Sequence, residues 1–88
     1  MPNPSFKLVI LTPKKRVFSG EVASLVAPGE LGYLGILANH APLVTTLVPG
    51  KMTFRDLAGS TQALQSIGAG LLEVYHNQAT LLLDDIAG

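Results

Sequence analysis

The beginning of the chain alternates as a β-strand does. In an extended segment, successive side chains point to opposite faces. By this period Phe6, Leu8 and Ile10 share one face, and Val9 and Leu11 lie on the other. Both faces are therefore apolar towards the end of the segment, which predicts a strand in the core.

Residues 51–57 show the clearest half-buried pattern. Met52 and Phe54 alternate there with Lys51, Thr53 and Arg55, as in a strand with one face on a core and the other in water. Other runs compatible with strands occupy residues 21–27, 43–48, 61–67, 71–75 and 78–83. The three leucines at 81–83 are also compatible with the start of a helix, so that alternative stays open.

Glycine and proline punctuate the whole sequence. The chain has 9 Gly and 6 Pro, which leave little room for long helices. Turns are predicted at Pro13-Lys14, Ser19-Gly20, Pro28-Gly29, Gly32, Gly35, Asn39, Pro49-Gly50, Gly59-Ser60, 68–70 and His76-Asn77. Their spacing is close to the ~8–12 residues typical of a sandwich or barrel, which predicts an all-β fold.

Length and charge limit the classes of function. The chain has 88 residues and no repeat, linker or charge run, so we expect a single domain over residues 1–88. Its 6 Lys+Arg balance 6 Asp+Glu, which argues against a nucleic-acid binder and against a polybasic membrane surface. The lack of Cys excludes disulfides, thiolate metal sites and Cys nucleophiles.

The charged fraction is low. Charged residues make up 14% of the chain, where roughly 25% is average. A small domain buries only about two thirds of its unfolded surface. We therefore infer that an uncharged or apolar face meets a partner; the alternative is an ordinary monomer with few charges.

No export signal or membrane span is expected. Residues 1–5 lack a basic region, and the longest apolar runs are far shorter than the ~18 residues that a membrane helix requires.

Glycine-rich segments do not form a nucleotide motif. Glycines at 29, 32 and 35 recur every third residue, and no Lys-Ser or Lys-Thr pair follows, which excludes a Walker loop. Residues 68–70 begin like a dinucleotide fingerprint, but Glu73 stands where a glycine belongs. We interpret them as a close backbone approach at a strand corner.

Residues with catalytic chemistry do not form a recognisable motif. His40 and His76 sit in different turns, without metal-ligand spacing. Asp84 and Asp85 are interpreted as a solvated chain end, and no Ser lies in a nucleophile elbow. We expect no catalytic residue, no metal and no cofactor.

Residues 35–50 are the segment of greatest functional interest. Apolar residues, the lone imidazole of His40 and Pro42 lie where glycines indicate a surface connection. Loops carry recognition more often than the elements they join. His40 either hydrogen-bonds its own turn or contacts a partner, and both interpretations stay open.

Several ordered pieces of the sequence carry a family resemblance: Phe18-Ser19-Gly20, residues 32–37, His40-Ala41-Pro42-Leu43, Leu47-Val48-Pro49-Gly50, residues 68–74 and residues 79–82. In them the chain resembles the N-terminal β-sandwich domain of the epsilon subunit of F-type ATP synthases. The resemblance implies a flattened β-sandwich or barrel of about ten short, mostly antiparallel strands. It also implies docking on the gamma subunit and on the polar loops of the membrane c-ring.

The resemblance assigns contacts to two groups of residues. Those implied to face the c-ring are Gly32, Tyr33, Leu34, Gly35, Ile36 and Leu37, which resemble a loop. Those implied to lie beside gamma are Thr12, His40, Pro42 and Leu43. The chain departs from the family where Ala38-Asn39 replaces Pro-Gly and where Tyr33 replaces an acid. Asn tolerates a left-handed turn, and Tyr offers apolar area with a hydroxyl donor.

The resemblance implies a rotor function without chemistry of its own. Such a subunit couples ion translocation to ATP synthesis, at the periphery of an energy-transducing membrane and on the cytoplasmic side of a bacterial inner membrane. Family members usually continue into a helical hairpin that inhibits ATP hydrolysis, and here the sequence stops at Gly88, so we expect no such inhibition. The alternatives are a small-ligand-binding β-barrel and a hydrolase that uses His40 with Asp84 or Asp85.

Overall fold

The computed structural model describes residues 4–87. The predicted domain of residues 1–88 extends slightly beyond this range, and the expectation of no export signal concerns residues that lie mostly outside it. Within residues 4–87, no helix has the length and hydropathy to span a bilayer.

Seven strands follow one another along the chain. They are β1 (Phe6–Leu11), β2 (Arg16–Gly29), β3 (Gly32–Leu37), β4 (Leu43–Leu47), β5 (Gly50–Asp56), β6 (Thr61–Tyr75) and β7 (Gln78–Ile86). The described residues contain no helix, so the all-β prediction is confirmed. The pairing of β1 with β7 is parallel and the other pairings are antiparallel, as expected.

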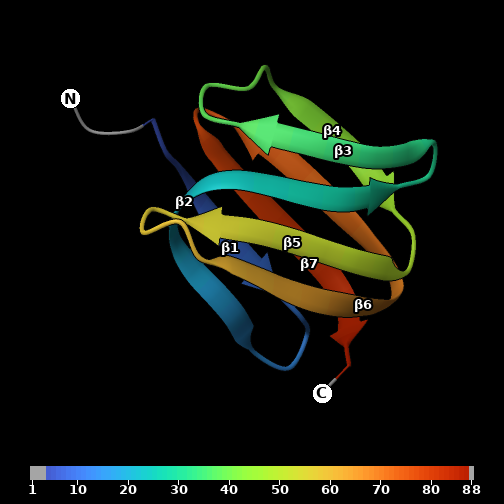
Figure 1. The fold of residues 1–88 in the computed structure, drawn as a ribbon. Coiled ribbons are helices and arrows are strands. Elements are labelled where there is room, and N and C mark those ends of the chain that lie inside the picture. The colour runs from blue at the N-terminus through green and yellow to red at the C-terminus, as the bar shows by residue number, and fades with distance from the viewer. Residues whose placement is uncertain (1–3, 88) are drawn as a thin grey trace.

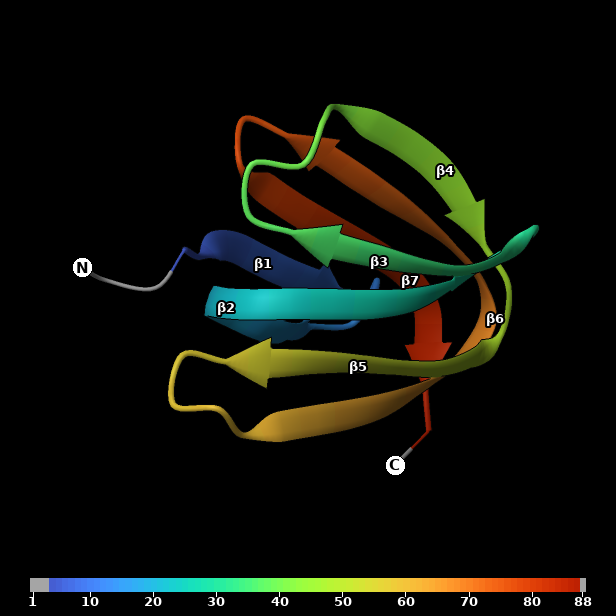
Figure 2. The same ribbon diagram turned by 45° about the horizontal axis from the view of Figure 1, so that its top comes forward.

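The strands form two layers packed face to face (Figures 1 and 2). The front layer consists of β3, the second half of β2, β5 and the first half of β6. The back layer consists of the first half of β2, β1, β7, the second half of β6 and β4. Because β2 and β6 each run through both layers, the chain has seven strands where about ten were expected.

The predicted turn at Ser19-Gly20 is wrong, because β2 continues through it. Gly20 pairs with Leu8 of β1, so the backbone groups of this stretch stay in a ladder. A Cβ at Gly20 would lie 3.2 Å from the ring of Phe18. The aromatic ring thus covers the glycine and compensates for its missing side chain.

The corner at residues 68–70 is confirmed as a close backbone approach. It lies inside β6, and the register of β6 with β7 shifts between Ile67 and Gly70. Gly68 has φ 76, in the left-handed region that favours glycine. A Cβ at Gly70 would lie 3.1 Å from the carbonyl oxygen of Leu82. These two glycines let β6 bend from one layer into the other.

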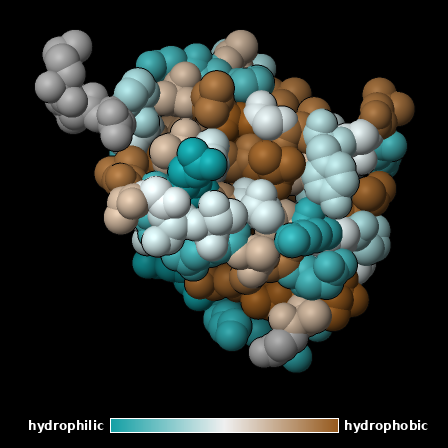
Figure 3. Space-filling view, viewed as in Figure 1, coloured by the Kyte–Doolittle hydropathy of each residue, from teal (hydrophilic) through white to brown (hydrophobic). Residues whose placement is uncertain are grey.

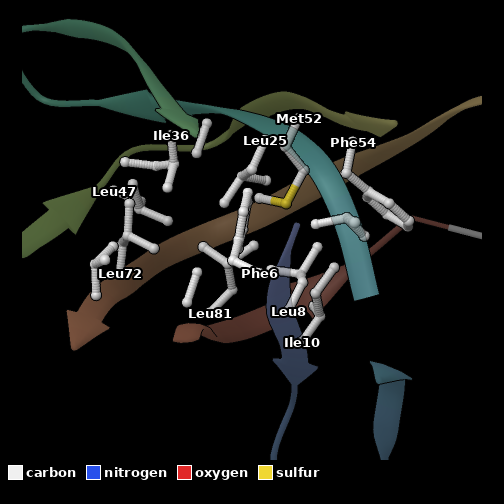
Figure 4. Packing of buried hydrophobic residues seen from close by; sticks show 14 of the residues in the cluster. Phe6, Leu8, Ile10, Leu25, Ile36, Leu47, Met52, Phe54, Leu72 and Leu81 are labelled. Carbon is white, nitrogen blue, oxygen red and sulfur yellow. The ribbon is translucent and has the colours of Figure 1, made fainter. Parts of the chain in front are cut away.

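Buried hydrophobic side chains fill the space between the layers (Figure 4). Phe6, Leu8 and Ile10 of β1 are buried, as the alternation predicts. The remaining large, fully buried side chains are Val22, Leu25, Ile36, Met52, Leu72 and Leu81. Each such aliphatic or aromatic side chain contributes roughly 1.5–3 kcal/mol when it leaves water.

The last strand resolves the ambiguity at the three leucines. β7 is a strand through Ile86, so the helix alternative is wrong. Leu81 and Leu83 are buried, whereas Leu82 is exposed. This alternation has the period of a strand, and the ladders with β6 and β1 satisfy the backbone.

Candidate docking surface

The hairpin between β2 and β3 ends in a turn with one exposed acid and one exposed leucine. Its two-residue turn, Glu30-Leu31, is closed by the pair Gly29 and Gly32. Gly32 has φ 128, and a Cβ at Gly29 would lie 2.9 Å from the carbonyl oxygen of Gly32, so both positions require glycine. Leu31 is fully exposed, at 104% of its reference area. The tip projects beyond the body of the sandwich (Figure 2).

Residues 32–37 form strand β3 rather than the expected loop. Ile36 is buried and Leu34 half-buried, whereas Tyr33, Gly35 and Leu37 are exposed. The glycines of this segment favour turns. Only two apolar side chains lie on its inward face, which is too few to show the period of a strand. Tyr33 and Leu37 can face a partner, and the side chain of Ile36 belongs to the core.

The connection from β3 to β4 is a tight turn around Asn39 and His40. Asn39 has φ 63, as expected for the residue that replaces a family glycine. The His40 amide donates to the carbonyl oxygen of Leu37 at 3.2 Å, and its Nδ1 lies 2.7 Å from the carbonyl oxygen of Ala41. His40 can therefore hydrogen-bond within its own turn and also contact a partner, because its side chain remains half-exposed.

Asn77 fixes this turn to the body of the sandwich. Its Oδ1 accepts a hydrogen bond from the amide of Asn39 at 2.7 Å. Its Nδ2 donates to the carbonyl oxygen of Ser5 at 2.9 Å. One side chain thus joins the β3–β4 turn, the β6–β7 turn and the residue before β1. Sequence reasoning recognised Asn77 only as a turn residue.

The beginning of β4 continues the surface. Pro42 is exposed and Leu43 is half-buried against the core. Val44, which the sequence analysis did not single out, is 65% exposed. Three of the four residues implied to lie beside gamma therefore form one segment, which begins at His40.

Thr12 lies apart from that segment. It occupies the turn after β1, where its amide donates to the carbonyl oxygen of Lys15 at 3.0 Å. His40 lies near the opposite end of β1, because the neighbouring Asn39 is tied to Asn77, which bonds Ser5. A strand of this length separates its two ends by roughly 20 Å. The structure does not bring Thr12 and His40 into one local patch.

The docking surface, defined as residues 31–44, contains no charged residue, and the exposed Glu30 borders it in the hairpin turn. No Asp, Glu, Lys or Arg occurs anywhere in residues 31–50. The sequence shows this uncharged run directly. The inference that a face of the domain meets a partner used only the charged fraction of the whole chain. Figure 3 shows hydrophobic side chains in the upper part of this view, where β3 lies in Figure 1, with hydrophilic residues around and among them. A low-charge patch of this kind is typical of an interface.

The hydrolase interpretation is not supported by the geometry. Asp84 and Asp85 are exposed residues near the end of β7. His40 lies near the beginning of β7, beside Asn77, so roughly 20 Å of strand separates the imidazole from the carboxylates. General acid–base catalysis needs these groups within hydrogen-bond reach. No group of three potential metal ligands occurs within residues 4–87.

Two open depressions lie on the outside of the sandwich. One, of about 640 Å³, is lined by Leu11, Thr12 and Asp84 among others. The second, of about 530 Å³, lies beside Leu37 and Leu57. Core side chains occupy the space between the layers, where a ligand-binding barrel would have its chamber. The arrangement favours docking to a macromolecule over the small-ligand alternative.

Fold and surface together define a small β-sandwich domain with one face of low charge. A family model described as "ATP synthase, Delta/Epsilon chain, beta-sandwich domain" matches residues 5–87. The chain belongs to this family, which confirms the resemblance seen in the sequence.

Relatives of two lengths are similar to the chain. It is 42% identical over 82 residues to the ATP synthase epsilon chain of Dichelobacter nodosus, covering 93% of this chain and 57% of that one. It is also 42% identical over 85 residues to the ATP synthase epsilon chain of Chlorobium limicola, covering 97% and 96%. The chain thus spans little more than half of the first relative and nearly all of the second.

Solved structures share the fold. A chain in the cryo-EM structure of Euglena gracilis mitochondrial ATP synthase (OSCP/F1/c-ring) matches with a TM-score of 0.87 and 19% identity, over 94% of this chain and 52% of that one. A chain in the Tetrahymena thermophila mitochondrial ATP synthase central stalk and c-ring matches with a TM-score of 0.81 and 15% identity, over 99% and 69%. At these identities the likeness concerns the fold alone.

Proposed function

We propose that this chain is a non-catalytic subunit of the central stalk of an F-type ATP synthase. It docks on the gamma subunit and on the c-ring, and so helps to couple ion translocation to ATP synthesis. The observation that carries the proposal is the uncharged docking surface on a sandwich of this family. The names of the relatives and the central-stalk assembly of a structural neighbour support it.

The docking surface divides into two parts by position. The β2–β3 hairpin, with Leu31 and Tyr33, projects from one end of the sandwich and is assigned to the c-ring. The turn and strand start at residues 40–44 lie at the other end of β3 and are assigned to gamma. The low charge suits both contacts, because burying an unpaired charge in an interface is costly.

The proposal places the chain at the periphery of an energy-transducing membrane, on the cytoplasmic side of a bacterial inner membrane. The bacterial sources of the relatives support this location. Contact with the c-ring is made through protein, without insertion into lipid.

Replacing both His40 and Leu43 with Glu tests the gamma contact. The added charges are expected to weaken binding to purified gamma about tenfold or more, because an interface anchor commonly contributes more than ~1 kcal/mol. A second variant pairs His40→Glu with Val44→Glu, since Leu43 is half-buried and its replacement also affects folding. Binding is measured by titration calorimetry, and folding by thermal unfolding of each variant.

A matched control carries the same added charge elsewhere. Gln62→Glu with Gln65→Glu changes two exposed positions of β6, in the strand farthest from β3 in the front layer. This control is expected to bind gamma as the unmodified chain does. Unchanged gamma binding by both test variants would reject the assignment of this contact.

A further inference from the structure

Strand β3 is an edge of the front layer. It pairs with β2 on one side, and within residues 4–87 no strand pairs with its other side. Figure 1 shows β3 at the upper margin of the front layer, with its free edge turned away from β2. An unpaired edge presents a row of backbone donors and acceptors that fits another extended strand.

The pairing with β2 determines which backbone groups of β3 are free. Pro28 has no amide hydrogen and stands opposite Tyr33, so this pair does not exchange hydrogen bonds. The carbonyl oxygen of Pro28 instead accepts from the amide of Val48 at 2.9 Å, on the side away from β3. Hydrogen-bonded pairs alternate along an antiparallel ladder. The amides and carbonyls of Tyr33, Gly35 and Leu37 therefore point towards the free edge.

The same three residues also lie on the exposed face of the strand. Tyr33 is 63% exposed and Leu37 is 65% exposed, with Gly35 between them. A second β3, antiparallel to the first and centred on Gly35, would pair Gly35 with Gly35 and Tyr33 with Leu37. The edge is therefore complementary to itself in its backbone groups and in its aromatic–aliphatic side-chain pairs.

β3 has no residue of the kinds that prevent such pairing. Natural edge strands use Lys, other charges or Pro to prevent association. β3 has none of these, and the net charge of the chain is zero, so two copies do not repel each other. The first half of β2, at an edge of the back layer, by contrast carries Arg16 and Glu21.

We propose that two copies of this chain pair through β3, antiparallel about Gly35, into one sheet that continues from one front layer into the other. The carbonyl of Leu37 already accepts from the His40 amide and would use its second lone pair. A single six-residue edge buries less area than a stable dimer requires. The dimer is therefore weak, and it covers the outer face of Tyr33 and Leu37.

Gly35→Pro tests the pairing with a minimal change. Proline removes the outward amide of residue 35, which β2 does not use, and it is tolerated at strand edges. Gly35→Ala is the matched control, because a Cβ at this position meets nothing within 4 Å and the amide remains. Sedimentation velocity from about 10 μM to about 1 mM covers the range in which weak dimers dissociate. Amide exchange at the highest concentration locates the contact.

The proposal predicts a concentration-dependent dimer for the unmodified chain and for Gly35→Ala, with slowed amide exchange at residues 33, 35 and 37. Gly35→Pro is expected to remain monomeric and folded. A monomer at every concentration, or a dimer that Gly35→Pro retains with protection in β4 instead, would overturn it. Binding of gamma through residues 40–44 is measured separately, so failure of self-pairing leaves the proposed function standing.

Discussion

Single side chains hold the docking surface in place, and Asn77 does so with two hydrogen bonds. It has φ 58 and bonds both Asn39 and Ser5. Asn77→Ala loses both bonds and puts alanine in the left-handed region, which Asn tolerates better, so we expect a loss of about 2 kcal/mol in the free energy of unfolding. Asn77→Gly keeps the backbone conformation and is expected to lose less. Urea denaturation measures both; equal stability of all three proteins would contradict this role.

Gly68 is expected to be harder to replace than Gly35 of β3. It has φ 76, and a Cβ at this position would lie only 2.6 Å from the Asp84 carboxylate and 3.0 Å from the Asp84 Cβ. Gly68→Ala should therefore destabilise the chain by about 1–3 kcal/mol. Gly35→Ala, which meets open space, should change stability by less than about 0.5 kcal/mol. If the two variants unfold at the same urea concentration, a side chain at position 68 does not strain the corner, and the prediction is wrong.

At the level of elements, the β2–β3 hairpin is proposed to contact the c-ring, while the side chains at its tip contribute little to the core. Leu31 lies outside the core and Tyr33 is mostly exposed. Leu31→Asp with Tyr33→Asp is expected to leave the unfolding free energy within about 1 kcal/mol, because each change affects a surface position. The same variant should lose binding to purified c-ring in detergent while it still binds gamma. Retained c-ring binding would reject the assignment of the hairpin.

Strands with a clear period were predictable, and the connections between them less so. The alternation in β1 and β5 identified buried faces directly, because one side of each strand meets the core. β3 was missed, because two glycines in six residues resemble a loop and its strand character depends on pairing with β2. The continuity of β2 through Gly20 likewise depends on β1, which is distant in sequence.

At the scale of the whole molecule, local sequence could not place the candidate site residues relative to one another. Thr12 and His40 are implied to lie beside the same subunit, yet they are near opposite ends of β1. That separation depends on the order of strands in the back layer, which no local pattern encodes. The clustering of His40, Pro42 and Leu43, by contrast, follows from their adjacency in the chain.

The central claim is that the uncharged face of this sandwich is covered by neighbours in the stalk of an ATP synthase. Its most direct test is affinity purification of the tagged chain from gently solubilised membranes of the organism that encodes it. The account predicts gamma and c bands in the eluate, and their loss when the hairpin and residues 40–44 carry the acidic replacements described above. An eluate that contains neither gamma nor c would contradict it.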